Sequence, residues 1–108
     1  MKSHVFTQDR GLYGKLDREA FRTTEDSAFS IFKAEKGWTI GHTPSGLSVD
    51  AIIRMGTRRT RKSLLDFVAE MEAAIPDACE ASKRILFSPP HKNDRWALQA
   101  MIDWRNGQ

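Results

Sequence analysis

The clearest pattern in the sequence is the stretch Ser27–Leu47, SAFSIFKAEKGWTIGHTPSGL. Its first part, Ser27–Glu35, alternates between the two sides of an extended chain and is rich in aromatic and β-branched residues, which favours a strand. Lys36 and Gly37 are typical of a turn, and the alternation in Trp38–His42 indicates the next strand. The stretch therefore predicts two antiparallel strands joined by a tight turn.

The end of this stretch, Gly41–Ser48 (GHTPSGLS), comes close to the phosphate-binding pattern G-x-x-x-x-G-K-[ST]. Leu47 stands where that loop needs its lysine, and the apolar residues of Leu47–Ile53 alternate as in a strand. Thr43-Pro44-Ser45-Gly46 has its proline and glycine where a hairpin loop with a glycine bulge needs them. We therefore predict a turn and a third strand over Leu47–Ile53, and no nucleotide site.

The second half of the chain has a helical pattern. Apolar residues recur at three- and four-residue spacings over Thr60–Ala74, and Pro76 ends this helix. A shorter helix is expected over Asp77–Arg84. A last amphipathic helix begins at Asn93 or Asp94, because either residue is a good N-cap.

The chain of 108 residues is long enough for one hydrophobic core but not for two, so we predict a single domain, 1–108. Its class is α+β: a three-stranded antiparallel meander over 27–55, with two or three helices within 57–106 packed on one face. The segment 1–26 is poorly patterned. There we expect a short strand at His4–Thr7 and one or two helical turns at Leu16–Arg22.

The composition, with 40% hydrophobic and 29% charged residues, is that of a soluble globular protein. No apolar run approaches the roughly 20 residues that cross a bilayer, so we expect no contact with a membrane. The N-terminus, MKSHVFTQDRGLYGK, lacks the apolar region of a signal peptide, and the lone Cys79 cannot form an internal disulfide. These features predict a cytoplasmic protein.

Residues with catalytic potential are few, and we predict no enzyme, no metal site and no cofactor. None of the three histidines has a second histidine or cysteine at metal-ligand spacing. Cys79 lacks the basic neighbour that would activate its thiol. His42 has two interpretations: a strand-end residue bonded to the turn, which we prefer, or a catalytic base with Asp50 or Glu35.

Positive charge is concentrated in RMGTRRTRK, which we call the basic segment (54–62). Its last two bases fall in the first turn of a predicted helix, where the helix dipole disfavours them, so the charge is expected to serve binding. The alternative is a solvated loop paired with Glu70 and Glu72. Trp38 and His42 are accessory candidates. The predicted contact residues are Arg54, Arg58, Arg59, Arg61 and Lys62.

Gly37–Leu47 (GWTIGHTPSGL), followed by basic residues and an amphipathic helix that ends Ala-Ile-Pro-Asp, resembles small uncharacterised proteins of bacteriophages and mobile elements. The resemblance covers about residues 37–77. It implies a small accessory protein that acts by binding, and anti-CRISPR proteins are one such class. The resemblance assigns no functional role to any residue of this chain.

Three functions are therefore open. The first is a stoichiometric inhibitor of a host nucleic-acid-targeting defence system, of anti-CRISPR type, that docks its basic segment on an acidic surface of a host protein complex or competes with nucleic acid for a host protein. The second is a nucleic-acid-binding accessory or regulatory protein that contacts the nucleic acid backbone. The third is a small hydrolase or nuclease that uses His42. No small-molecule substrate is inferred.

Overall fold

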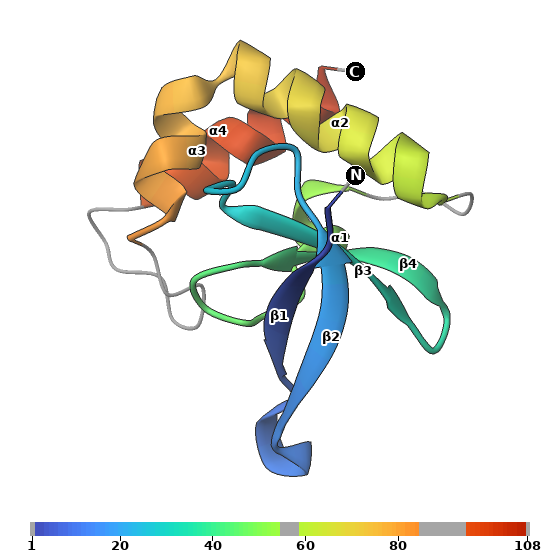
Figure 1. The fold of residues 1–108 in the computed structure, drawn as a ribbon. Coiled ribbons are helices and arrows are strands. Elements are labelled where there is room, and N and C mark those ends of the chain that lie inside the picture. Colours follow the sequence, from blue (N-terminus) through green and yellow to red (C-terminus); the bar gives the residue numbers. More distant parts are fainter. Residues whose placement is uncertain (1, 55–58, 85–94, 108) are drawn as a thin grey trace.

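The computed structural model describes residues 2–54, 59–84 and 95–107, and it places them in a curled antiparallel sheet with helices on one side (Figure 1). The strands are β1 (His4–Asp9), β2 (Lys15–Phe21), β3 (Phe29–Ala34) and β4 (Gly37–His42). The helices are α1 (Asp50–Ile53), α2 (Arg61–Ala74), α3 (Pro76–Ser82) and α4 (Arg95–Asn106). The predicted α+β class is confirmed, with four strands in the sheet where we expected three.

The N-terminal segment forms a long hairpin that the sequence only partly predicts. The strand expected at His4–Thr7 is present as β1, but Leu16–Arg22, where we expected helical turns, lies mostly in β2. β1 and β2 pair over six residues, from His4 opposite Ala20 to Asp9 opposite Lys15. This ladder outweighs the weak local preference of the segment for a helix.

The third strand predicted over Leu47–Ile53 is wrong. Ser48 makes one isolated bridge to Gly41, and the chain then forms the short helix α1. The pattern was ambiguous, because residues that alternate over five positions also include a pair four residues apart, as on one face of a helix. The structure uses that pair: Val49 and Ile53 are fully buried, whereas Ala51 is exposed.

The turn at Thr43-Pro44-Ser45-Gly46 has the predicted form. Gly46 adopts a φ of 77°, and the Gly46 and His42 amides donate to the carbonyls of His42 and Leu47 at 2.9 and 2.8 Å. The turn also reaches the first strand, since the Asp9 amide donates to the Gly46 carbonyl at 2.8 Å. This bond joins the two ends of the sheet, which therefore curls into an almost closed shape with a hollow inner face.

The inner face of the curled sheet is filled at one end by an inner cluster, Phe6, Ala20 and Phe32, each no more than 1% exposed. The rings of Phe6 and Phe32 stack with centroids 4.9 Å apart. β1 passes so close to β4 that a Cβ added at Gly41 would lie 2.4 Å from the Phe6 ring. Glycine at position 41 thus allows the curl.

The main core lies on the outer face of the sheet, between the strands and the helices (Figure 1). Its fully buried residues come from every layer: Phe29, Ile31, Ile40, Val49, Ile53, Leu64, Met71, Ala97 and Met101. Thr60 caps α2 in a capping box with Ser63, as expected for a helix that begins there. Pro76, which ends α2, is also the first residue of α3. The predicted start of the last helix, at residue 93 or 94, lies outside the described residues.

We expect Gly41→Ala to lower the free energy of unfolding by about 1–3 kcal/mol, because the new methyl group would overlap the Phe6 ring. Chemical denaturation measures this loss. The double variant Gly41→Ala/Phe6→Leu tests the cause: the smaller side chain frees space, so the double variant should lose less than the sum of the two single changes. Strict additivity would contradict the proposed overlap.

Candidate functional site

The described members of the basic segment are bound within the molecule. Arg59 forms an ion pair with Asp50, whose side chain is nearly buried. The guanidinium groups of Arg54 and Arg61 lie over aromatic rings, 5.1 and 4.4 Å from their centroids. Arg58 lies outside the described residues.

Each of these contacts attaches the segment to a different part of the fold. Arg54 covers Phe67 of α2, whereas Arg61 reaches from α2 to Phe21 at the end of β2. Lys62 is exposed and pairs with Asp66 one turn further along α2, at 2.9 Å. The alternative interpretation was that the bases of this segment pair with Glu70 and Glu72, and these contacts show other partners. Much of this positive charge therefore has a structural use.

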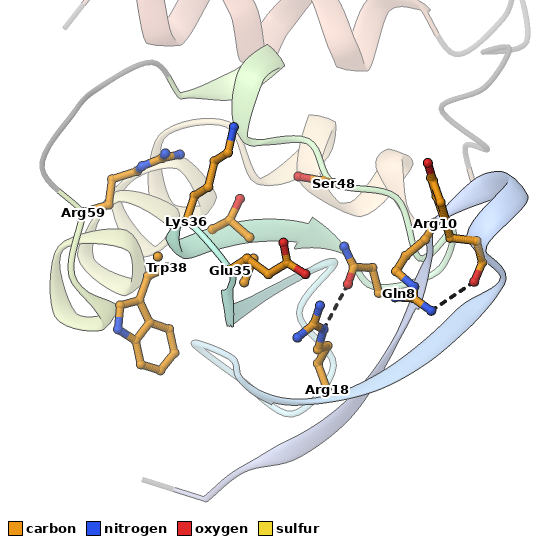
Figure 2. Close-up of a pocket in the computed structure, with 12 residues that line it drawn as sticks. Gln8, Arg10, Arg18, Glu35, Lys36, Trp38, Ser48 and Arg59 are labelled. Carbon is orange, nitrogen blue, oxygen red and sulfur yellow. Dashed lines mark hydrogen bonds between the residues drawn. The ribbon is translucent and has the colours of Figure 1, made fainter.

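A pocket of about 580 Å³ opens next to the inner cluster, and we call it the basic pocket (Figure 2). By strand alternation its walls continue the inner face: Gln8 follows Phe6 along β1, and Arg18 precedes Ala20 along β2. The rim comes from the tip of the β1–β2 hairpin and from the β3–β4 turn. The charged residues that line it are Arg10, Arg18, Glu35, Lys36 and Arg59.

The charge of the basic pocket is positive: its lining holds four cationic side chains, of which Arg59 is paired with Asp50, and one carboxylate, Glu35. Arg18 Nε donates to Gln8 Oε1 at 3.0 Å, and Arg10 Nη2 donates to the Tyr13 carbonyl at 3.0 Å (Figure 2). Both acceptors are neutral, so these hydrogen bonds do not neutralise the charges of the two arginines. In the described part of the chain, Arg10, Arg18 and Lys36 make no ion pair.

Sequence reasoning missed three of these four cations. Arg10, Arg18 and Lys36 are far apart in the sequence and become neighbours only through the pairing of β1, β2 and β3. A correct assignment of β2 would have placed Arg18 on the same face as Phe6, because the two residues are opposite each other in the ladder. Arg59 is the member of the predicted contact set that lines the pocket.

Trp38, an accessory candidate, contributes to the wall of the pocket but not through its ring. Its neighbours Thr39 and Gly37 belong to the inner face, so the Trp38 side chain leaves β4 on the opposite side. There the indole is partly buried and tilts against Phe21, with ring centroids 6.2 Å apart. Figure 2 shows the ring directed away from the pocket. The indole is therefore a packing element and not a free stacking platform.

His42, the other accessory candidate, is fully buried and bonded to the turn, as our preferred interpretation expected. Its Nδ1 lies 2.7 Å from Ser45 Oγ, and its Nε2 lies 2.8 Å from the Ser82 carbonyl oxygen. A carbonyl accepts only, so Nε2 carries the proton and Nδ1 accepts from the Ser45 hydroxyl. Burial lowers the pKa of His42 to about 4, against a small opposing effect of the Ser82 carbonyl. Asp50, its suggested catalytic partner, is paired with Arg59.

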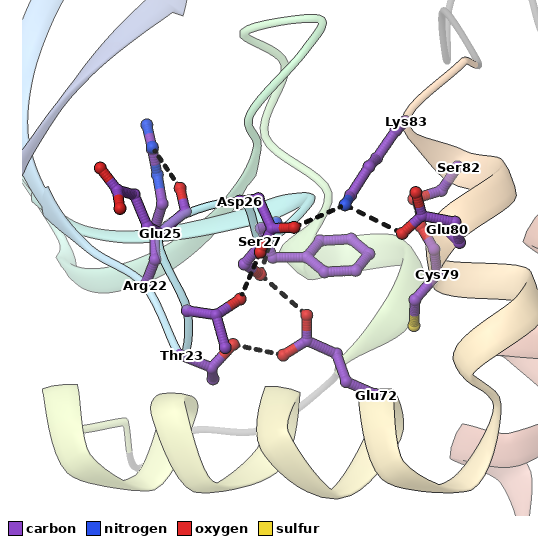
Figure 3. Close-up of polar contacts among 12 residues, drawn as sticks. Arg22, Thr23, Glu25, Asp26, Ser27, Glu72, Cys79, Glu80, Ser82 and Lys83 are labelled. Atoms are coloured by element: carbon purple, nitrogen blue, oxygen red, sulfur yellow. Dashed lines mark hydrogen bonds and ion pairs between the residues drawn. The ribbon is translucent and has the colours of Figure 1, made fainter.

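A second polar cluster joins the β2–β3 connection to the helices (Figure 3). Glu72 of α2 accepts hydrogen bonds from the Thr23 and Ser27 hydroxyls, the latter at 2.9 Å. Lys83 bridges Asp26 and Glu80 at 3.7 and 2.9 Å. These contacts hold the connection against α2 and α3, so we assign the cluster a structural role.

Cys79 lines the small pocket beside this cluster, and its side chain is buried. Burial, together with the charge of Glu72, raises the pKa of the Cys79 thiol to about 12. A thiol with such a pKa is protonated at neutral pH and is a poor nucleophile. Among residues 2–54, 59–84 and 95–107, no group of three histidine, cysteine or acidic side chains is placed to hold a metal ion.

Comparisons with protein-family models, with curated proteins and with solved structures found no match to this chain. None of the helices in the described ranges is long and apolar enough to cross a membrane.

We expect the stability of the protein to fall as the pH drops from about 6.5 to about 4. The folded-state pKa of His42, about 4, lies below the ordinary value of 6.5, so the unfolded chain binds more protons in this window. The contribution of His42 is complete above the window, and up to about 3 kcal/mol of it is lost across the window. Denaturant titrations at several pH values measure this loss. His42→Gln should flatten the dependence, and an unchanged slope would contradict the assignment.

We expect Glu72→Ala to lower the free energy of unfolding by about 1–3 kcal/mol, since it leaves the hydroxyls of Thr23 and Ser27 without their acceptor. Thermal and chemical denaturation measure the change. The matched control is Glu70→Ala on the exposed side of the same helix, which should stay within about 0.5 kcal/mol of the wild type. Equal effects of the two variants would show that Glu72 does not hold the connection in place.

Proposed function

We propose that this protein acts by binding and not by catalysis, and that the basic pocket and its rim bind single-stranded nucleic acid. One observation carries the proposal: Arg10, Arg18 and Lys36, which make no ion pair in the described part of the chain, gather around one open pocket. Arg59 lies at the same pocket, but its charge is paired with that of Asp50. Such uncompensated charge favours a ligand with several negative groups.

The shape of the site supports a single strand over a duplex. A pocket of about 580 Å³ has the size that takes a nucleotide or a similar group, whereas the paired bases of a duplex are stacked inside the helix and cannot enter a pocket. The described helices pack against the outer face of the sheet (Figure 1), whereas side chains of its inner face line the pocket. A hollow face of a small antiparallel sheet is a shape that other proteins use to bind single strands.

The burial of the two residues best suited to catalysis also supports a binding role. His42 and Cys79 are buried, and the hydrogen bonds of His42 go to a turn serine and a backbone carbonyl. We place the protein in the cytoplasm as part of this proposal. The role of a phage-type inhibitor stays a prediction, in which the same positive surface would face an acidic host protein.

The test is a fluorescence anisotropy titration of labelled single-stranded DNA, single-stranded RNA and duplex DNA at two salt concentrations. We expect single strands to bind more tightly than duplex. With phosphate contacts from Arg10, Arg18 and Lys36, the logarithm of the affinity should fall with the logarithm of salt with a slope of about −2.

Three double charge reversals with equal changes in net charge identify the surface that binds. Arg10→Glu/Lys36→Glu changes the basic pocket and should abolish binding, whereas Arg61→Glu/Lys62→Glu changes the basic segment on α2 and should have a smaller effect. Lys33 is exposed on the outer face of β3, so Lys2→Glu/Lys33→Glu is the matched control. Thermal denaturation confirms that each variant is folded.

The outcomes separate the hypotheses. Equal losses in all three variants would show that net charge, and not the pocket, attracts the ligand. A loss confined to the Arg61 and Lys62 variant would return the contact to the basic segment. Absence of binding to every nucleic acid at low salt would overturn the proposal.

A further inference from the structure

The tip of the β1–β2 hairpin carries two apolar side chains that contribute to no core. Leu12 is fully exposed and Tyr13 is 84% exposed, the highest values for large apolar side chains among the described residues. Figure 1 shows the hairpin projecting from the body of the molecule, with this tip at its far end. Single exposed apolar residues are common, but adjacent ones at the end of a projecting hairpin form a small apolar patch, and exposed apolar patches mark sites of interaction.

The tip has a defined backbone conformation that presents these side chains outward. Gly11 and Gly14 adopt φ values of 64° and 79°, which residues with a Cβ rarely adopt. The Gly11 amide donates to Asp9 Oδ1 at 2.9 Å, and the Arg10 amide donates to the Gly14 carbonyl at 2.9 Å. Between them, Gly11–Tyr13 form a single 3-10 turn. The exposure of Tyr13 is thus built into the backbone of the turn.

Tyr13 is also part of the basic pocket. It lines the rim, and its backbone carbonyl accepts the hydrogen bond from Arg10 Nη2 at 3.0 Å, so a cation is held against the backbone of the residue that carries the exposed ring. Proteins that bind single strands without sequence preference combine cations along the backbone with aromatic rings on which the bases stack. The rim offers both components within a few residues of each other.

We infer that Tyr13 stacks on an unpaired nucleobase while Arg10 and Lys36 contact the flanking phosphates, with Leu12 packed against the sugar or the next base. This inference rests on the proposed function and adds to it the group that the protein recognises. The site reads the face of a base and not its hydrogen-bonding edge, so it tolerates any sequence but requires that the base be unpaired.

A direct test uses the fact that the chain contains one tyrosine. Protein labelled with 3-fluorotyrosine has a single ¹⁹F resonance, which comes from position 13. A short oligothymidylate should shift this resonance through the ring current of the stacked base. An abasic oligonucleotide of the same length, which keeps the phosphates, should shift it much less.

Affinities measured by anisotropy give the second test. Tyr13→Ala should weaken the binding of oligothymidylate about five- to a hundredfold and leave the binding of the abasic oligonucleotide unchanged. Tyr13→Phe should retain the wild-type affinity, because the aromatic face is kept. Val5→Ala is the control, since Val5 is an exposed apolar residue of β1 away from the tip.

The possible failures are distinguishable. If the Arg10→Glu/Lys36→Glu variant loses binding but Tyr13→Ala does not, the nucleic-acid site stands and the stacking inference is wrong. If no oligonucleotide binds, both fail. Titration with vesicles of anionic phospholipid supplies a further outcome: binding lost in Leu12→Ser would make the tip a membrane-contacting element and would overturn the inference.

Discussion

A single backbone hydrogen bond, from the Asp9 amide to the Gly46 carbonyl, connects the first strand of the sheet to the turn that follows the last. It brings both edges of a four-stranded sheet together and gives the sheet a hollow inner face. Phe6 and Phe32 fill one end of this face, and glycine at position 41 leaves room for them. The other end stays open as the basic pocket. The basic pocket is thus the part of the inner face that the inner cluster does not fill.

The positive charge of the chain is divided between two uses. In the basic segment, Arg54 and Arg61 cover aromatic rings, and Arg59 neutralises the nearly buried Asp50. At the basic pocket, the charges of Arg10 and Lys36 have no partner of opposite sign in the described residues. In this chain the dense run of bases is largely engaged in contacts within the fold, whereas Arg10 and Lys36, which are far apart in the sequence, are exposed at one pocket. Arg59 lines the pocket as well, but its charge is paired with that of Asp50.

What the sequence predicts correctly is local. The turn at Thr43-Pro44-Ser45-Gly46 follows from the backbone preferences of proline and glycine, and the start of α2 follows from the Thr60 cap. The strand predicted over Leu47–Ile53 was wrong because the apolar spacing of this segment fits a strand and a helix equally. β2 was missed because its pairing with β1, and not its own composition, makes it a strand. The basic pocket was missed for the same reason, because Arg10, Arg18 and Lys36 become neighbours only when the sheet has formed.

The burial of Cys79 has a practical consequence. Its thiol has a pKa of about 12 and is protonated at neutral pH, so alkylating reagents, which attack thiolates, will modify it slowly while the protein is folded. A cysteine placed at an exposed position will react first, and the natural cysteine need not be replaced. Spin labels or fluorophores can therefore be attached at a chosen site, one at a time, in an otherwise unaltered chain. The slow rate at which such reagents modify Cys79 then measures how often the core around this residue opens to solvent.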